Sequence, residues 1–162
     1  MTMKLLSSLV LALALACKPA PPAEVVLREM PLDSLDELIT KSGVELDQGA
    51  IKVVATGPTT VHVAELEGLA LDDARLIYRA RLKSEGLNGR AYLEMWCAFP
   101  GMGEFFSRAL ESPLSGTNDW TTQETPFLLQ KGQTPSRVKL NLVVDGAGTV
   151  WIDRIVLAKG PL

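Results

Sequence analysis

Apolar and polar residues alternate with a period of two through most of the chain, from about residue 50 to residue 158. Because successive side chains of a β-strand point to opposite faces, this alternation predicts half-buried strands. Turn-forming residues separate the alternating segments, and no long helix stands between them to connect parallel strands. We expect strands at residues 50–55, 61–64, 74–83, 90–99, 120–129, 137–144 and 149–158, and a short one near Phe105. The sequence therefore predicts an all-β fold, an antiparallel two-sheet β-sandwich.

Two sandwich topologies, the immunoglobulin-like one and the jelly roll, accommodate seven or eight strands. The length of 162 residues and the absence of a cysteine pair for a central disulfide favour the jelly roll. Cys97 lies inside an apolar segment, residues 95–99, and we expect it to be a buried, unreactive thiol.

Residues 24–49 do not follow the alternation. Their apolar residues have helical spacing: Leu32, Leu35, Leu38 and Ile39. Asp33 or Ser34 could cap a helix here, whereas Pro31 and Gly43 limit its length to about three turns. We expect a short helix or an irregular segment that enters the sandwich.

The last alternating segment changes phase. Val150 and Ile152 share one parity, but the apolar residues resume at Ile155 and Leu157, one residue out of register. An extra residue at 153–154 restores the alternation, and this is the signature of a β-bulge.

Residues 148–157, read as Gly-Thr-Val-Trp-Ile-Asp-Arg-Ile-Val-Leu, resemble the last strand of galactose-binding-like jelly rolls. They are especially similar to carbohydrate-binding modules of the family 4/9/22 type, and the segment from Trp120 to Phe127 resembles a second strand of that fold. The resemblance implies a structural calcium ion held in part by Asp153, although Arg154 replaces the second acid of the family's pair. The alternative is that Asp153 forms a hydrogen bond with the backbone at the bulge.

The N-terminus has the pattern of an export signal. Lys4 is followed by an apolar stretch, residues 5–16, which is too short for a transmembrane helix and has the size of a signal-peptide core. Small residues then precede Cys17, and this resembles the lipobox of bacterial lipoproteins. The resemblance implies a signal peptide at 1–16, lipidation of Cys17, a Pro-rich spacer at 17–23 and a single sandwich domain at 24–162. Because Lys18 follows the cysteine, it also implies an outer-membrane location in a Gram-negative host, facing the periplasm or the surface.

The residues needed for catalysis are scarce. His62 is the one histidine of the chain, no serine stands in a nucleophile elbow, and the carboxylates are scattered. A net charge of −3 and the lack of a basic run also argue against nucleic-acid binding. We therefore expect neither an enzyme nor any cofactor, the possible calcium ion apart.

A binding face is more plausible. Tyr92, Glu94 and Trp96 share one parity, opposite the apolar residues 93, 95 and 97, and Arg79 and Arg81 stand on the neighbouring strand. Aromatic rings stack on sugar faces, and charged groups bind hydroxyls, so these five residues could form a glycan site. Alternatively, the aromatic residues of this row face the core, and parity alone leaves both interpretations open.

Other aromatic residues complete the candidates. We expect Trp120, Phe127 and Trp151 to be packing residues, whereas the segment from Phe99 to Phe106 is either a second recognition surface or a loop anchored to the core.

The sequence supports two alternative functions. The first is an envelope lipoprotein with a carbohydrate-binding module, and the alternative is an accessory lipoprotein that docks another envelope protein.

Overall fold

The computed structural model describes residues 23–162, so the predicted signal peptide, Cys17 and most of the predicted spacer lie outside the described residues. Every strand pairing in this range is antiparallel. The elements are β1 (Val25–Met30), the 3₁₀ helix η1 (Leu35–Glu37), β2 (Val44–Asp47), β3 (Ala50–Thr56), β4 (Thr59–Glu67), β5 (Ala74–Phe99), β6 (Gly103–Arg108), β7 (Leu114–Leu129) and β8 (Arg137–Gly160). Within residues 23–162, no helix has the length and apolar character needed to cross a membrane.

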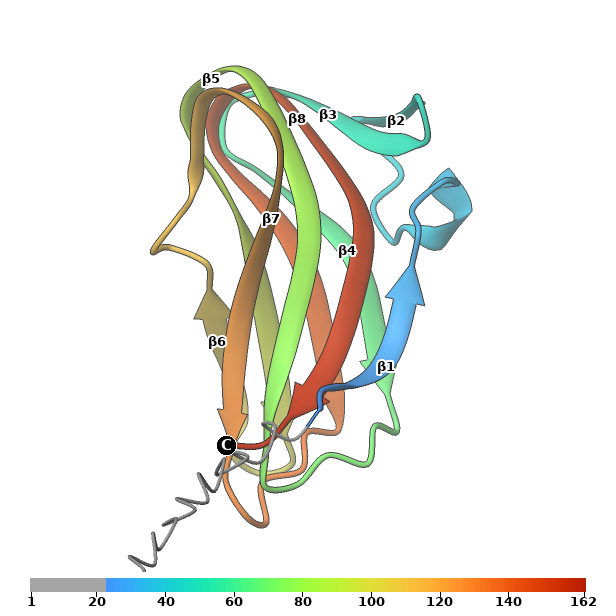
Figure 1. Cartoon of the computed structure of the whole chain (residues 1–162), viewed down its shortest axis with the longest axis vertical. Coiled ribbons are helices and arrows are strands. Elements are labelled where there is room, and N and C mark those ends of the chain that lie inside the picture. Colours follow the sequence, from blue (N-terminus) through green and yellow to red (C-terminus); the bar gives the residue numbers. More distant parts are fainter. Residues whose placement is uncertain (1–22) are drawn as a thin grey trace, which may run out of the picture.

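Strands β5 and β8 are long and fold over together, and each contributes to both layers of the sandwich (Figure 1). Residues 75–85 of β5 pair with 149–160 of β8, and residues 88–98 pair with 137–147. We call the layer of β7, the first half of β5, the second half of β8, β1 and β3 sheet I. Sheet II contains β6, the second half of β5, the first half of β8 and β4.

The fold-over corrects the predicted strand boundaries. Residues 84–89 and 145–148 were expected to be a loop and a turn, but both remain within β5 and β8. Glycine makes the close approach at the bend possible, because a Cβ on Gly89 would lie 2.2 Å from the carbonyl oxygen of Asp145. A Cβ on Gly146 would lie 2.1 Å from the carbonyl oxygen of Asn88. The other predicted strands are present, and the one near Phe105 is β6.

The core fills the space between the two sheets. Its fully buried side chains include Tyr78, Leu82, Leu93, Met95, Leu140, Leu142 and Ile152. Cys97 is fully buried among them, and burial raises the pKa of its thiol to about 12, which agrees with an unreactive cysteine.

The predicted bulge in β8 is confirmed. Arg79 pairs with Val156 but Arg81 pairs with Asp153, so β8 carries one extra residue at this point. Arg154 takes a positive φ of 49°, and its N–H donates to the carbonyl of Pro31 at 3.2 Å. As a result, Ile152 and Ile155 both face the core.

Residues 24–49 join the sandwich instead of forming a helix of several turns. β1 pairs with β8 just after the bulge, and β2 forms a hairpin with β3. The helical part is limited to η1, whose N-cap is Ser34, one of the two predicted caps. Leu32 and Leu38 are buried in the core on either side of η1, and this anchoring breaks the expected periodicity.

Candidate binding face on sheet II

Four polar side chains form one hydrogen-bonded row across the outer face of sheet II. Arg108, Glu94, Asn141 and His62 are direct cross-strand partners on β6, β5, β8 and β4. Arg108 Nε donates to Glu94 Oε2 at 2.6 Å, and Asn141 Nδ2 donates to Glu94 Oε1 at 3.0 Å. His62 Nδ1 lies 2.9 Å from Asn141 Oδ1. We call this set the polar row.

The chemistry of the polar row fixes its donors. A carboxylate only accepts hydrogen bonds, so Asn141 turns its amide nitrogen to Glu94 and its oxygen to His62. His62 must therefore carry a proton on Nδ1, and in the neutral ring Nε2 remains free as an acceptor for a ligand. At the other end, Arg108 keeps further guanidinium N–H groups beyond the Nε that binds Glu94.

Glu94 is the buried charge of the row, with an exposed fraction of 5%. Burial by itself raises the pKa of this carboxyl group, but hydrogen bonds from Trp96, Asn141 and Arg108 outweigh that effect and lower it. The carboxylate is therefore ionised at neutral pH, and it holds Arg108 and Asn141 in position.

An aromatic pair lies beside the polar row. Trp96 and Phe106 are cross-strand partners with ring centroids 5.0 Å apart and an interplanar angle of 50°. Phe106 is 51% exposed, whereas Trp96 is half-buried. Lys139 is the partner of Trp96 on β8, and its ammonium group is held 2.9 Å from Glu104. The face thus combines an apolar platform with fixed charged groups.

The β4 side of the face is hollowed. A cavity of about 260 Å³ is lined by Ile39, His62, Ala64, Glu65, Lys139 and Asn141. Tyr92 stands on the same face beyond the polar row, but it is only 6% exposed and has the guanidinium of Arg90 5.7 Å from its ring centre. Tyr92 therefore supports the face more than it presents a contact surface.

The structure separates the five residues predicted to form one site. Tyr92, Glu94 and Trp96 lie on the outer face of sheet II, because residues 93, 95 and 97 fill the core. Arg79 and Arg81 lie on the outer face of sheet I, on the other side of the sandwich, because β5 folds over between the two halves. The expectation that all five share one face was therefore wrong.

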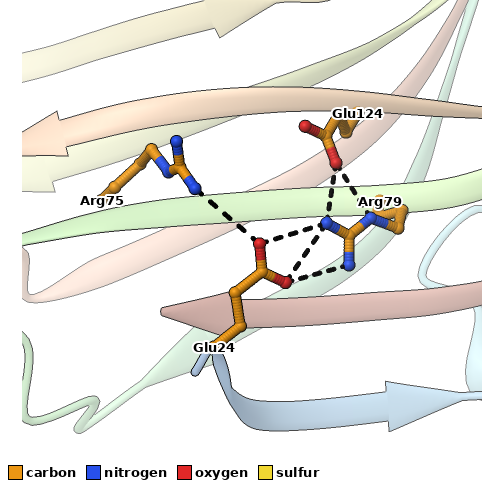
Figure 2. Close-up of polar contacts among 4 residues, drawn as sticks. All are labelled: Glu24, Arg75, Arg79 and Glu124. Carbon is orange, nitrogen blue, oxygen red and sulfur yellow. Dashed lines mark hydrogen bonds and ion pairs between the residues drawn. The ribbon is translucent and has the colours of Figure 1, made fainter. Parts of the chain in front are cut away.

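Ion pairs occupy both arginines on sheet I. Arg79 binds Glu124 at 2.7 Å and Glu24 at 3.2 Å, and Figure 2 shows it between these two carboxylates. Arg81 donates from Nε and Nη2 to the two carboxylate oxygens of Asp153, at 2.8 and 2.5 Å. These contacts join the residue before β1 to β5, β7 and β8 and give both arginines a structural role.

The surroundings of Asp153 do not fit a calcium site. A calcium ion needs six or more oxygen ligands, but Arg81 takes both carboxylate oxygens and places a cation beside them. The described part of the chain has no group of three histidine, cysteine, aspartate or glutamate residues placed to hold a metal ion. The expected backbone hydrogen bond at the bulge is likewise replaced by this ion pair.

The remaining tryptophans lie on the outer face of sheet I, and a cationic side chain lies over the ring of each. Arg81 lies 4.9 Å from the ring centre of Trp120, and Lys83 lies 4.9 Å from that of Trp151. Trp151 is 8% exposed and donates from Nε1 to Asp47 at 2.8 Å. These contacts agree with the predicted packing role.

Comparison with solved structures identifies the fold. The chain is similar to the CBM22-1 xylan-binding domain from Paenibacillus barcinonensis Xyn10C, with 11% identity and a TM-score of 0.59 over 88% of this chain and 99% of that one. It is also similar to a variant of CBM29-2 complexed with cellulohexaose, with 12% identity and a TM-score of 0.53 over 87% and 94%. The fold is the jelly roll of carbohydrate-binding modules. The predicted antiparallel jelly-roll β-sandwich is thus confirmed, and its structural neighbours are carbohydrate-binding modules, as the resemblance implied for the fold.

A family 29 carbohydrate-binding module gives the same result, with 14% identity and a TM-score of 0.52 over 88% of this chain and 92% of that one. A scan against models of protein families finds no match. A search of curated proteins also finds none. At these identities the likeness is one of fold, so function must be argued from the side chains of this chain.

Proposed function

We propose that this chain is a non-catalytic carbohydrate-binding module, and that the outer face of sheet II binds an oligosaccharide. The observation that carries the proposal is the juxtaposition of the aromatic pair, Trp96 and Phe106, with the polar row from Arg108 to His62. The similar xylan-binding and cellulohexaose-bound domains share the fold and support the choice of ligand class.

The two parts of the face would act differently on a sugar. The ring of Trp96 and the exposed part of Phe106 offer apolar surface for the C–H face of a pyranose, and stacking of this kind removes apolar area from water. The guanidinium of Arg108 lies 4.3 Å from the ring centre of Phe106, so this charged group stands directly beside the apolar surface. The free guanidinium N–H groups of Arg108, the ammonium of Lys139 and Nε2 of His62 are placed for hydroxyl groups. Because the polar row crosses four strands about 4.8 Å apart, a roughly 14 Å span suits an oligosaccharide better than a single sugar.

The charges of the face favour binding over hydrolysis. A glycosidase needs two carboxyl groups about 5 to 9.5 Å apart, one of which must be protonated or free to attack. Here Glu94 is ionised and both of its oxygens accept hydrogen bonds, and Glu104 is held by Arg137 and Lys139. These carboxylates fix neighbouring side chains in place.

The proposal includes attachment to a bacterial envelope through a lipid on Cys17, with residues 17–23 as a short spacer. Its support is the sequence alone: Lys4, the apolar stretch 5–16 and the small residues before the cysteine. In a Gram-negative host, Lys18 after the cysteine favours the outer membrane as the location. Mass spectrometry of Cys17 in the expressed chain would test the anchor separately from the glycan site.

The test of glycan binding uses isothermal titration calorimetry of the detergent-solubilised full-length chain, because Trp96→Ala would itself remove the fluorescent reporter of this face. Xylohexaose and cellohexaose are the first of a panel of oligosaccharides, and Trp96→Ala is compared with Trp120→Ala as a matched control. Loss of an aromatic contact worth about 1.5 to 3 kcal/mol would weaken binding roughly ten- to a hundredfold in Trp96→Ala. Trp120→Ala, on the opposite face, should bind as the parent does. Equal loss in both variants, or no saturable binding of any oligosaccharide, would overturn the assignment and favour docking of another envelope protein.

A further inference from the structure

A cluster of apolar side chains is exposed at one end of the sandwich. Met102, Phe105 and Leu128 are 60%, 47% and 55% exposed, and we call these three residues the apolar cap. Beneath them, Phe99 stacks edge-on to Phe105 with centroids 6.0 Å apart, and its ring lies 6.1 Å from that of Phe127. A hollow of about 240 Å³ opens between these rings. A contiguous exposed apolar patch of this kind marks an interaction surface.

The apolar cap lies at the end of the sandwich where the described chain begins. The turn from β5 to β6, the end of β7, the end of β8 and the start of β1 lie together at the lower end of Figure 1, opposite the bend of β5 and β8. Strand register agrees with this placement, because residue 74 pairs with 129, residue 75 with 160 and residue 99 with 103.

Ion pairs fix the start of the domain at this end. Glu24 binds Arg79 at 3.2 Å and lies 3.8 Å from Arg75, and Figure 2 shows its carboxylate between the two guanidinium groups. Six residues stand between Cys17 and Glu24, so the two positions are seven residue steps apart. A fully extended chain spans at most about 3.6 Å per residue, so a lipid on Cys17 would hold Glu24 within roughly 25 Å of the membrane.

We propose that the apolar cap rests on the lipid bilayer surface, with Met102, Phe105 and Leu128 at the boundary between headgroups and acyl chains. The inference depends on the proposed anchor at Cys17, and it adds a second contact that orients the domain. Apolar side chains at such a boundary typically enter it by about 5 to 10 Å. A lipid surface is favoured over a protein partner because the short tether brings this end of the domain to the membrane.

The proposed contact has a consequence for the glycan face. With the apolar cap on the bilayer, the strands of both sheets stand upright and the bend near Gly89 and Gly146 points away from the membrane. The outer face of sheet II is then directed sideways, where an oligosaccharide can reach Trp96 and the polar row without crossing the lipid surface.

The test compares two positions in the full-length chain reconstituted into phosphatidylcholine vesicles. An environment-sensitive fluorophore is attached to Met102→Cys at the apolar cap, or to Asn88→Cys at the opposite end. Cys97 is buried and does not compete for the label. Quenching by bromine-labelled lipid acyl chains is expected for the label at 102 and not for the label at 88.

Vesicle flotation of the same samples separates the two proposals. If the chain does not float, the anchor fails and the membrane contact fails with it. If it floats but the label at 102 is not quenched, or both labels are quenched equally, the apolar cap does not rest on the bilayer although the anchor stands.

A matched pair of triple variants provides a second readout on the label at Asn88→Cys. The first variant replaces Met102, Phe105 and Leu128 with serine. This change should increase the rotational freedom of the vesicle-bound domain, measured as a fall in the fluorescence anisotropy of the label. The control replaces Leu46, Val54 and Leu110 with serine, since these are also exposed apolar residues but lie outside the cap. Equal anisotropy in the two variants would contradict the proposed contact.

Discussion

Replacing Glu94 with glutamine tests the polar row directly. Both oxygens of this carboxylate accept hydrogen bonds, from Arg108 Nε at 2.6 Å and from Asn141 Nδ2 at 3.0 Å. Glutamine offers one acceptor and one donor, so one of these two neighbours must then face an N–H group. A hydrogen bond to a charged group contributes about 1.5 to 3 kcal/mol. Because the side chain of Arg108 is 34% exposed and water can replace part of the contact, we expect a loss of about 2 kcal/mol in the free energy of unfolding.

The loss of stability in Glu94→Gln should depend on pH. Hydrogen bonds lower the pKa of Glu94 in the folded chain below its usual value of 4.5. Its contribution to stability is therefore complete above pH 4.5 and is lost as the pH falls through the lower pKa of the folded state. Urea unfolding of both chains at pH 7 and at successive steps below pH 4.5 measures the difference.

The parent and Glu94→Gln should differ by about 2 kcal/mol at pH 7 and converge as the pH falls. The comparison isolates Glu94, because Glu104, whose pKa is also lowered by Lys139 and Arg137, is present in both chains. A difference that stays constant or grows between pH 7 and pH 3 would refute the described electrostatics of the row.

Three further predictions concern the scaffold. Gly89→Ala should lower the free energy of unfolding by more than about 3 kcal/mol, because the added Cβ would lie 2.2 Å from a backbone oxygen. Gly57 has open space around it, so the free energy of unfolding of Gly57→Ala should stay within about 1 kcal/mol of the parent value. Urea unfolding of the two variants measures this difference. The Cys97 thiol should react with a disulfide reagent only after unfolding, and rapid reaction at pH 8 in the folded chain would contradict its burial. Removing calcium with a chelator should leave the melting temperature unchanged. Asp153→Asn should lower the melting temperature, because it removes the ion pair with Arg81. A melting temperature that rises when calcium is added would contradict the conclusion that the surroundings of Asp153 do not fit calcium.

Local patterns could be read from the sequence, and long-range ones could not. The phase shift between Ile152 and Ile155 predicts the bulge, because each must reach the core from the same strand. The fold-over of β5 was missed because glycine near residue 89 is typical of a loop and also of a close backbone crossing. Period-two parity states which side chains share a face within one segment, but it does not assign the two halves of β5 to opposite sheets.

The candidate face shows the same limit. The alternation of the sequence places Tyr92, Glu94 and Trp96 on one face of the strand. In the structure Leu93 and Met95 are buried in the core, so this face points outward. The other members of the polar row come from three other strands, and their positions depend on a register that no short motif encodes. Arg108, Asn141 and His62 could have been found only after the pairing of β4, β5, β6 and β8 was known.

The most direct test of the central claim is a map of amide chemical shifts, recorded on the ¹⁵N-labelled chain during titration with the tightest-binding oligosaccharide of the panel. We predict that the shifts concentrate on the outer-face strands of sheet II, at residues 92–98, 104–108, 137–143 and 60–65. Shifts centred on residues 79–83, 120–124 and 151–153 of sheet I, or none at millimolar ligand, would contradict a glycan-binding face at Trp96 and the polar row.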